Sequence, residues 1–229
     1  MSYFDLRNVQ AYEYEDYELP FYLKKIFLNL SPTSRILDYG CGFGQLLDAL
    51  KKSGFSNICG ADIDGQALEV SGKIHQVYDC REIGWVNELT NSFDLIIMSH
   101  VLEHFPKDEM ISRLIQIRTL LKDNGKIVIM VPNAQSNTGA YWAYEDFTHH
   151  YLFTSGSIYY VLKAAGFSKV DFIDIDCLEG LKPSKKLVRK LFLSLYRMNF
   201  NFWNRITASS FHRPSPQIFS YEIKVSAEK

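Results

Sequence analysis

The sequence predicts an α/β fold in which helices cover both faces of a mostly parallel sheet. Short apolar runs alternate along the 229-residue chain with segments whose apolar residues recur every three or four positions. Residues 95–98 and 127–131 are apolar without interruption, as buried parallel strands are. This alternation favours right-handed strand–helix–strand units.

In chain order, the sequence predicts seven strands and four main helices. The predicted strands are residues 35–39, 57–62, 76–78, 93–99, 126–131, 169–175 and 217–225. The predicted helices are residues 45–52, 66–73, 107–121 and 155–165. Gly125 and Gly166 follow the last two helices and are expected to end them. The final strand alternates apolar and polar residues, which predicts a half-exposed strand near an edge.

Composition indicates a single domain spanning residues 1–229. With 47% hydrophobic and 22% charged residues, the chain can bury a substantial core, and disorder is excluded. The 25 basic residues balance 26 acidic ones, which argues against a generally basic nucleic-acid binder. No apolar run reaches the roughly 18–20 residues that span a bilayer. Residues 1–7 lack the features of a secretory signal, so we expect a cytoplasmic protein.

The four cysteines are scattered and contain no C-x-x-C pair. They are Cys41, Cys59, Cys80 and Cys177. This spacing predicts reduced thiols, with neither a zinc site nor a disulfide framework. The acidic residues near the expected cleft form no obvious ligand set, so we expect no metal.

A glycine-rich turn follows the first predicted strand. Gly40, Gly42 and Gly44 let the chain turn tightly into a helix, whose N-terminus directs N–H groups at a ligand. A dinucleotide fingerprint would place its third glycine at Gln45. Asp62 ends the second strand, where its carboxylate could accept from both hydroxyls of a ribose. The spacing therefore predicts a nucleoside-containing ligand.

Three successive motifs resemble those of class I S-adenosylmethionine-dependent methyltransferases. They read Asp-Tyr-Gly-Cys-Gly-Phe-Gly at 38–44, Gly-Ala-Asp-Ile-Asp at 60–64, and Phe-Asp-Leu-Ile at 93–96 with Val-Leu-Glu-His at 101–104. The run Glu-Asp-Phe-Thr-His at 145–149, with 153–154 and 162–167, is similar to a bacterial subgroup of small-molecule and glycan O-methyltransferases. The resemblance covers about residues 30–178 and the final strand.

The resemblance implies a Rossmann-like, seven-stranded sheet whose last strand is antiparallel, with S-adenosylmethionine as cofactor and S-adenosylhomocysteine as product. It implies that the glycine loop contacts the methionine part of the cofactor and that Asp62 binds the ribose. Ile63 would flank the adenine and Asp79 would reach its amino group. The full implied cofactor set is Asp38, Gly40, Gly42, Gly44, Asp62, Ile63, Asp79, Ser99 and His100, the last two lining the cleft near the sulfonium.

Methyl transfer to an alcohol also requires a base, and histidine is the usual one at neutral pH. We favour His149 as catalytic base, with Asp146 in an Asp-x-x-His arrangement that fixes the imidazole tautomer. The alternative for His149 is a loop-locking or substrate-positioning role. His104 is the second catalytic candidate, and its alternative is a structural role at a helix start. His150 is expected to be an exposed histidine that points away.

Aromatic residues surround both expected binding regions. A set in the long segment 133–153 is expected to form an acceptor wall or, alternatively, to anchor a mobile loop: Tyr141, Trp142, Tyr144, Phe147 and Tyr151. The N-terminal residues 1–30 are expected to form an aromatic lid or a helix packed on the sheet edge.

An insertion at about residues 180–215 separates the last two predicted strands. Its residues 182–213 hold eight Lys or Arg and no Asp or Glu, which leaves 17 basic and 26 acidic residues, a balance of −9, for the remainder. The apolar residues repeat at helical spacing, which predicts a basic amphipathic helix. Three interpretations remain open: a cap over the acceptor site, peripheral contact with the inner membrane surface or a lipid-linked substrate, and a homodimer interface.

The sequence therefore predicts methyl transfer to a hydroxyl of a small molecule, most simply a sugar or glycan precursor of a bacterial surface polysaccharide. Another small acceptor, such as a quinone or natural-product precursor, fits the same residues. A nicotinamide-dependent oxidoreductase and a non-catalytic nucleoside-binding subunit are the alternatives from other classes. A nucleic-acid methyltransferase is disfavoured, because residues 99–102 read Ser-His-Val-Leu where a Pro-Pro-Tyr type of motif is expected.

Overall fold

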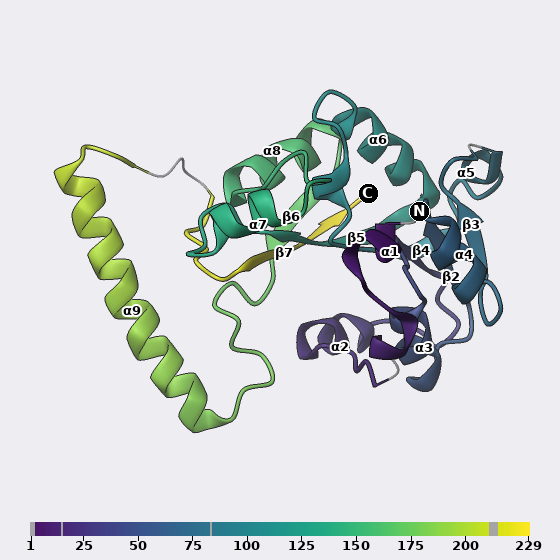
Figure 1. The fold of residues 1–229 in the computed structure, drawn as a ribbon, viewed down its shortest axis with the longest axis horizontal. Coiled ribbons are helices and arrows are strands. Elements are labelled where there is room, and N and C mark those ends of the chain that lie inside the picture. Colours follow the sequence, from purple (N-terminus) through teal and green to yellow (C-terminus); the bar gives the residue numbers. More distant parts are fainter. Residues whose placement is uncertain (1–2, 15, 83, 211–214) are drawn as a thin grey trace.

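The computed structural model describes residues 3–14, 16–82, 84–210 and 215–229. A seven-stranded sheet in the order β3-β2-β1-β4-β5-β7-β6 forms its centre (Figure 1). Strands β1 to β5 run parallel, and β7 pairs antiparallel with both β5 and β6. The fold class and the antiparallel last strand predicted from the sequence are confirmed.

The strands agree with the predicted order along the chain. They are β1 (Ile36–Tyr39), β2 (Ile58–Asp62), β3 (Gln76–Asp79), β4 (Phe93–Ser99), β5 (Leu121–Pro132), β6 (Ser168–Phe172) and β7 (Glu222–Glu228). The α-helices are α1 (Tyr3–Arg7), α2 (Phe21–Phe27), α3 (Gln45–Lys52), α4 (Gly65–Ser71), α5 (Gly84–Glu88), α6 (Met110–Leu120), α7 (Gly139–Glu145), α8 (Ser155–Ala164) and α9 (Pro183–Ile206). Two 3₁₀ turns, η1 (Ala11–Tyr14) and η2 (Leu102–His104), complete the described elements.

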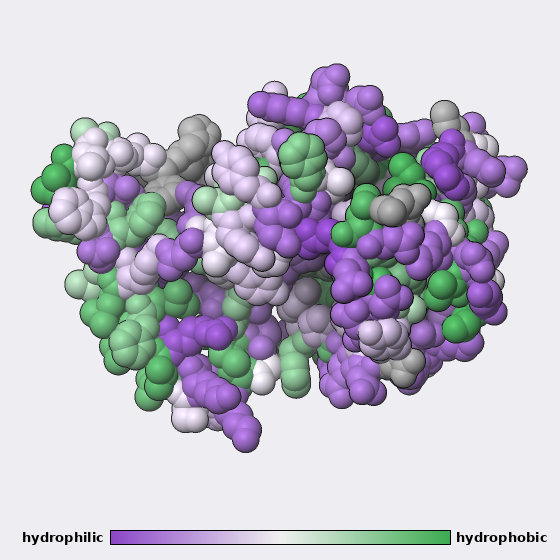
Figure 2. Space-filling view, viewed as in Figure 1, coloured by the Kyte–Doolittle hydropathy of each residue, from purple (hydrophilic) through white to green (hydrophobic). Residues whose placement is uncertain are grey.

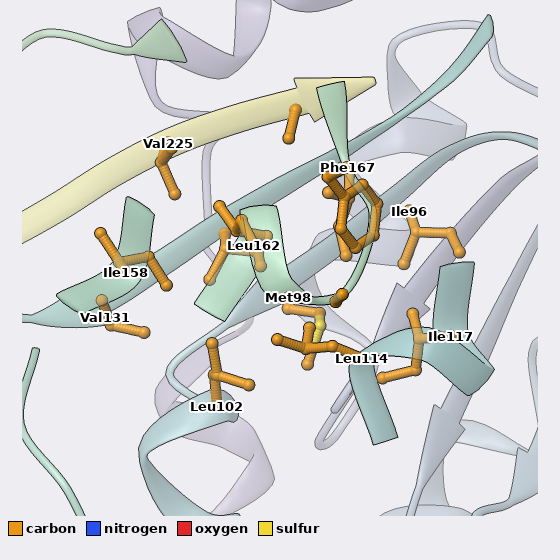
Figure 3. Close-up of a cluster of buried hydrophobic side chains, with 14 of the residues drawn as sticks. Ile96, Met98, Leu102, Leu114, Ile117, Val131, Ile158, Leu162, Phe167 and Val225 are labelled. Atoms are coloured by element: carbon orange, nitrogen blue, oxygen red, sulfur yellow. The ribbon is translucent and has the colours of Figure 1, made fainter. Parts of the chain in front are cut away.

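Helices bury apolar side chains against both faces of the sheet. Ile36 and Leu37 are adjacent in β1 and enter different clusters, because successive strand residues point to opposite faces. One cluster joins β1, β4 and β5 to α6 and α8, as the packing of Met98, Leu114 and Leu162 illustrates (Figure 3). The other joins the same strands to α2 and α3. The two layers fix the carboxyl edge of the parallel strands, where the candidate site lies.

Gly125 does not end a helix, contrary to the prediction. Helix α6 ends at Leu120, and β5 begins at the next residue, with a register irregularity opposite Phe93. A Cβ at Gly125 would lie 2.9 Å from the carbonyl oxygens of Lys122 and Phe93, so the glycine permits a close strand approach. Gly166, by contrast, follows α8 with φ +86°, as a helix-ending glycine does.

The last strand also differs from its prediction. It begins at Glu222 instead of residue 217, and its polar face is buried: Glu222 is 5% and Lys224 is 4% exposed. The alternating pattern was compatible with burial because the two side chains neutralise each other, with Lys224 Nζ 3.1 Å from Glu222 Oε1.

The insertion forms the long helix α9, which lies at the side of the molecule in Figure 1 and buries none of its residues. Nine large apolar side chains of α9 are 50–71% exposed, so most of its apolar face does not cover the acceptor segment in this arrangement, and the cap interpretation stays a prediction. Among the described helices, none has the length and apolar character needed to cross a bilayer.

Candidate active site

The glycine loop lies where β1 and β2 end. The N–H groups of Gly40 and Cys41 donate to the carbonyl oxygen of Ala61, at 2.7 and 3.1 Å, and so tie the two strands together. Gly40, Gly42 and Gly44 have φ of +87°, +51° and +88°. Residues with a side chain rarely adopt these positive φ angles, because the Cβ atom then clashes with the backbone. A Cβ at Gly40 would lie 2.1 Å from Val101 Cγ2. Glycine is therefore required here by conformation and by space.

Asp62 is held beside this loop by backbone donors. Its Oδ2 accepts from Gly42 N at 2.8 Å, and its Oδ1 accepts from Ile63 N at 2.7 Å and Asp64 N at 2.9 Å. Burial raises the pKa of Asp62, while the three N–H donors oppose that rise. The carboxylate is thus fixed at the strand end.

The loop can accommodate a nucleoside bearing an amino-acid chain. Gln45 begins α3, and its Oε1 is buried without a hydrogen-bond partner among the described residues. This oxygen lies 3.6 Å from the position of a Cβ at Gly42, so it faces the same loop. An ammonium group would satisfy such an acceptor. The orphaned oxygen, the loop and Asp62 together fit S-adenosylmethionine.

The other residues implied for cofactor binding differ in accessibility. Ile63 is 63% exposed beside Asp62, where an adenine could cover it. Asp79 lies next to Asp62 in the register of β2 and β3, but its carboxylate accepts from Arg81, which holds the pKa of Asp79 below its usual range. Asp38 is 3% exposed, and burial, together with the nearby Asp62, raises its pKa to about 8. Asp38 is therefore a buried residue of β1.

Ser99 ends β4, and His100 follows it with φ +55°. The imidazole lies between two carboxylates, with Nδ1 3.3 Å from Glu103 Oε1 and Nε2 3.3 Å from Glu222 Oε2. Burial lowers the pKa of His100, but the two carboxylates outweigh it and raise the value to about 10. At neutral pH, His100 is therefore a cation.

Glu103 and Glu222 were not identified from the sequence. Glu103 is fully buried in η2, and neither carboxylate oxygen has a hydrogen-bond partner among the described residues. Glu222 also forms an ion pair with Lys224, so the charged cluster includes this lysine. The Nζ of Lys224 lies 3.0 Å from Cys177 Sγ. The available signal was the pair of opposite charges at positions 222 and 224, which share one face of the last strand.

His149 is anchored differently from the prediction. Its Nδ1–H donates to the carbonyl oxygen of Trp142 at 2.7 Å, so a backbone group fixes the tautomer and leaves Nε2 free to accept a proton. Nε2 lies 3.9 Å from Asp146 Oδ2 and 4.0 Å from Glu103 Oε1. Asp146 thus faces the reactive nitrogen instead of orienting the ring through Nδ1.

Asp146 does not take the predicted orienting role, because it faces Nε2 and not Nδ1 of His149, and its oxygens accept from other groups. Oδ1 accepts from Thr148 N and Oγ1 at 3.0 and 2.6 Å, and Oδ2 accepts from Tyr3 Oη at 2.6 Å. Burial alone would raise the pKa of Asp146, but these hydrogen bonds lower it to about 2. Asp146 is therefore an anion that joins α1 to the loop after α7.

His104 lies beside His149, with ring centroids 4.8 Å apart. Its Nδ1 lies 2.8 Å from Thr148 Oγ1, and burial lowers its pKa. His150 is exposed, and its N–H donates to the carbonyl oxygen of Glu103 at 2.8 Å. The loop thus brings His149 to the acidic cluster and leaves the His150 side chain outside.

One group of side chains has a spacing suited to a metal ion. The ligand atoms of Glu103, His104 and His149 all lie within 4.8 Å of one another. Both rings have their Nδ1 engaged, which leaves two Nε2 atoms and a carboxylate, a donor set suited to divalent transition metals. The sequence-based expectation of no metal therefore stays a prediction.

Helix α1 covers the edge between the glycine loop and residues 133–153. Phe4 packs on Phe43 with ring centroids 4.4 Å apart, and Arg7 Nη1 contacts Glu145 Oε2 at 2.8 Å. Three aromatic side chains of the expected acceptor wall are exposed: Tyr141 (57%), Tyr144 (85%) and Phe147 (102%). Exposed rings therefore lie in the same segment as the buried imidazole of His149.

The known proteins that this chain resembles in sequence include methyltransferases. A family model described as a methyltransferase domain matches residues 12–171. A ubiquinone biosynthesis O-methyltransferase from Coxiella burnetii is 28% identical over 104 residues, which cover 43% of this chain and 43% of that protein. The aligned region spans less than half the length of the curated relatives that the chain matches.

Two solved structures share the fold. A SAM-dependent methyltransferase from Archaeoglobus fulgidus aligns with 99% of this chain and 100% of its own, at a TM-score of 0.67 and 20% identity. Phosphoethanolamine N-methyltransferase 2 from Haemonchus contortus, solved with S-adenosyl-L-methionine, aligns with 96% of this chain and 56% of its own, at a TM-score of 0.58 and 19% identity.

Proposed function

The chain belongs to the methyltransferase domain family, and on that premise we propose that it methylates a hydroxyl group of a small molecule. Its cofactor is S-adenosylmethionine. When bound, this cofactor supplies a methyl group that is already activated on a sulfonium. Most of the protein's contribution is then positioning and removal of the acceptor's proton.

The glycine loop and Asp62 would hold the cofactor. Asp62 would accept hydrogen bonds from the ribose hydroxyls, and the N-terminus of α3 directs its positive dipole end into the loop. The buried Oε1 of Gln45 accepts from the ammonium group of the methionine part. Ile63 covers one face of the adenine with its exposed side chain.

His149 is the proposed base, and its anchored ring is the observation that carries the proposal. The hydrogen bond from Nδ1–H to Trp142 leaves the Nε2 lone pair available for the acceptor's hydroxyl proton. Glu103 and Asp146, about 4 Å from Nε2, stabilise the imidazolium that then forms. His100 is unsuited to this role because its pKa of about 10 keeps it protonated at neutral pH.

Helix α1 would act as a lid during the reaction. The side chain of His149 is only 6% exposed, so an acceptor reaches it only after a covering element moves. Tyr3 and Arg7 connect α1 to Asp146 and Glu145 through a hydrogen bond and an ion pair. Opening breaks these contacts, and closure restores them and excludes water from the site.

A sugar or glycan precursor is the proposed acceptor. Tyr141, Tyr144 and Phe147 present exposed rings in the segment that carries His149, and sugar faces stack on such rings. A quinone precursor is the second candidate. It is favoured by the similarity to the Coxiella burnetii ubiquinone O-methyltransferase.

Transfer of a labelled methyl group tests the proposal. The full-length protein is incubated with labelled S-adenosylmethionine and panels of sugar nucleotides, glycans and hydroxylated quinone precursors. We expect label in an ether that resists mild base, and its loss in His149→Ala but not in His150→Ala. Label on nitrogen or carbon, or full turnover by His149→Ala, would contradict O-methylation by this base.

A further inference from the structure

We propose that α9 is a docking helix that binds the surface of an anionic membrane. The helix has 24 residues, so it extends about 36 Å. It contains six Lys or Arg and no Asp or Glu. This inference concerns a surface remote from the glycine loop and does not depend on which acceptor is methylated.

One side of α9 holds it to the rest of the protein. Arg197 Nη2 contacts Asp176 Oδ1 at 3.1 Å, and Tyr196 Oη donates to Asn137 Oδ1 at 2.7 Å. Phe200 packs against Phe219 with ring centroids 5.0 Å apart. The half-buried residues recur every three or four positions from Leu193 onward, so these contacts fix the orientation of the helix.

The opposite side is apolar and faces outward over most of its width, while Val188 and Phe192 at its margin also line a hollow that includes Asn137 and Phe219. At 100° per residue, its large side chains fall within less than half of the helix circumference. They are Leu187, Val188, Leu191, Phe192, Leu195, Met198, Phe202, Trp203 and Ile206, each at least 50% exposed. Figure 2 shows hydrophobic side chains gathered over the region of α9. Within the described residues, this is a continuous apolar face attached to an otherwise well-packed domain.

The charges around this apolar face indicate what kind of surface binds it. Lys182, Lys185, Lys190 and Arg205 are exposed at or near the helix, whereas Arg189 and Arg197 contact the body of the protein. Basic residues beside an apolar face with Trp and Phe are the composition of helices that lie in the interfacial plane of a bilayer. Anionic headgroups would attract these basic side chains electrostatically.

A second copy of the chain is a weaker match for the same face. An isologous contact between two α9 helices would bring together two segments that each carry six basic and no acidic residues. Such like-charge proximity opposes association. A membrane surface offers apolar depth and negative charge together.

Vesicle flotation of the full chain tests the proposal. Vesicles of phosphatidylcholine with phosphatidylglycerol are compared with vesicles of phosphatidylcholine alone. We expect flotation only with the anionic vesicles, and loss of binding as salt rises. The fluorescence of Trp203, isolated by comparison with Trp203→Phe, should shift to shorter wavelength on binding.

The matched variant is Leu191→Glu with Phe202→Glu, which places two acids on the apolar face. It should weaken vesicle binding by at least roughly tenfold, given the apolar area lost. Ile115→Glu, an equivalent change at another exposed apolar residue on α6, should leave binding unchanged. Both variants should keep the circular dichroism of the native protein, because neither site is buried.

Failure to float with anionic vesicles at low salt would overturn the proposal. So would equal binding by the Leu191→Glu, Phe202→Glu variant. Sedimentation equilibrium tests the alternative that α9 binds a second copy of the chain. If the wild type is a dimer, the Leu191→Glu, Phe202→Glu variant is a monomer and vesicle binding is absent, α9 would be assigned to self-association.

Discussion

The two halves of the candidate site are built by different means. In the cofactor half, backbone groups do the positioning: Gly40 and Cys41 donate to Ala61, and three N–H groups hold Asp62. In the acceptor half, ionisable side chains dominate, and His100 lies between Glu103 and Glu222. The first half is fixed by chain conformation, whereas the second depends on charges brought together by the fold. Variants should therefore fail differently in the two halves.

The largest expected effect lies in the acceptor half. His149→Ala should lower kcat by roughly 10²–10⁴-fold, the range for loss of a general base. Affinity for S-adenosylhomocysteine should stay within about twofold, because His149 touches the acceptor side and not the glycine loop. Methyl-transfer kinetics and calorimetry measure the two quantities separately. His150→Ala is the matched control, and equal losses in both variants would show that the loop, not the base, was damaged.

In the cofactor half, Gly40→Ala should reduce stability and cofactor affinity together. The new Cβ would lie 2.1 Å from Val101 Cγ2 at a φ of +87°, so we expect a loss of about 3 kcal/mol or more in the free energy of unfolding. Gly54→Ala, at φ +93° with no atom within 4 Å, carries the conformational strain without the clash and should cost about 1–2 kcal/mol. Denaturant titration measures both. Equal costs would show that the contact with Val101 is unimportant.

The charged cluster predicts a dependence of stability on pH. Because Glu103 and Glu222 raise the pKa of His100 from 6.5 to about 10, their attraction stabilises the fold fully below about pH 6.5. This contribution is lost as pH rises through about 10. Unfolding curves of His100→Gln should therefore converge toward those of the wild type at alkaline pH, whereas His150→Gln should follow the wild type throughout. A constant gap between His100→Gln and wild type would contradict the charge assignment.

The smallest expected effect is that of metal removal. Treatment with a chelator should change turnover by less than about twofold, because a dication beside Glu103 would also lie near the protonated His100. The test is methyl transfer before and after dialysis against EDTA. Loss of activity that Zn²⁺ or Fe²⁺ restores would instead identify Glu103, His104 and His149 as a metal site.

The cofactor half could be predicted from the sequence because its constraints are local. Gly40, Gly42 and Gly44 stand within five residues, and Asp62 ends the next strand, so spacing alone indicated their proximity. The succession of seven strands along the chain and the antiparallel β7 were also predicted, the first from alternation and the second from the family resemblance. In both cases the signal lies within a short window of the chain.

The acceptor half could not be predicted in the same way. Glu222 approaches His100 only because β7 pairs with β5 in one register, across more than a hundred residues of chain. The group that orients His149 is a carbonyl oxygen of Trp142, which no side-chain pattern reveals. Tyr3 reaches Asp146 through the placement of α1, a segment with few apolar anchors. Long-range register and backbone groups therefore limit what a single sequence discloses.

Calorimetric titration with S-adenosylhomocysteine tests the central claim most directly. We expect binding to the wild type and no heat with NADH. In Asp62→Ala, affinity should fall by roughly 100-fold, the loss of two charge-assisted hydrogen bonds to the ribose, while Asp79→Ala should change it far less. Binding of NADH, or no binding of S-adenosylhomocysteine by folded wild-type protein, would contradict the account of the glycine loop and Asp62 as the cofactor site.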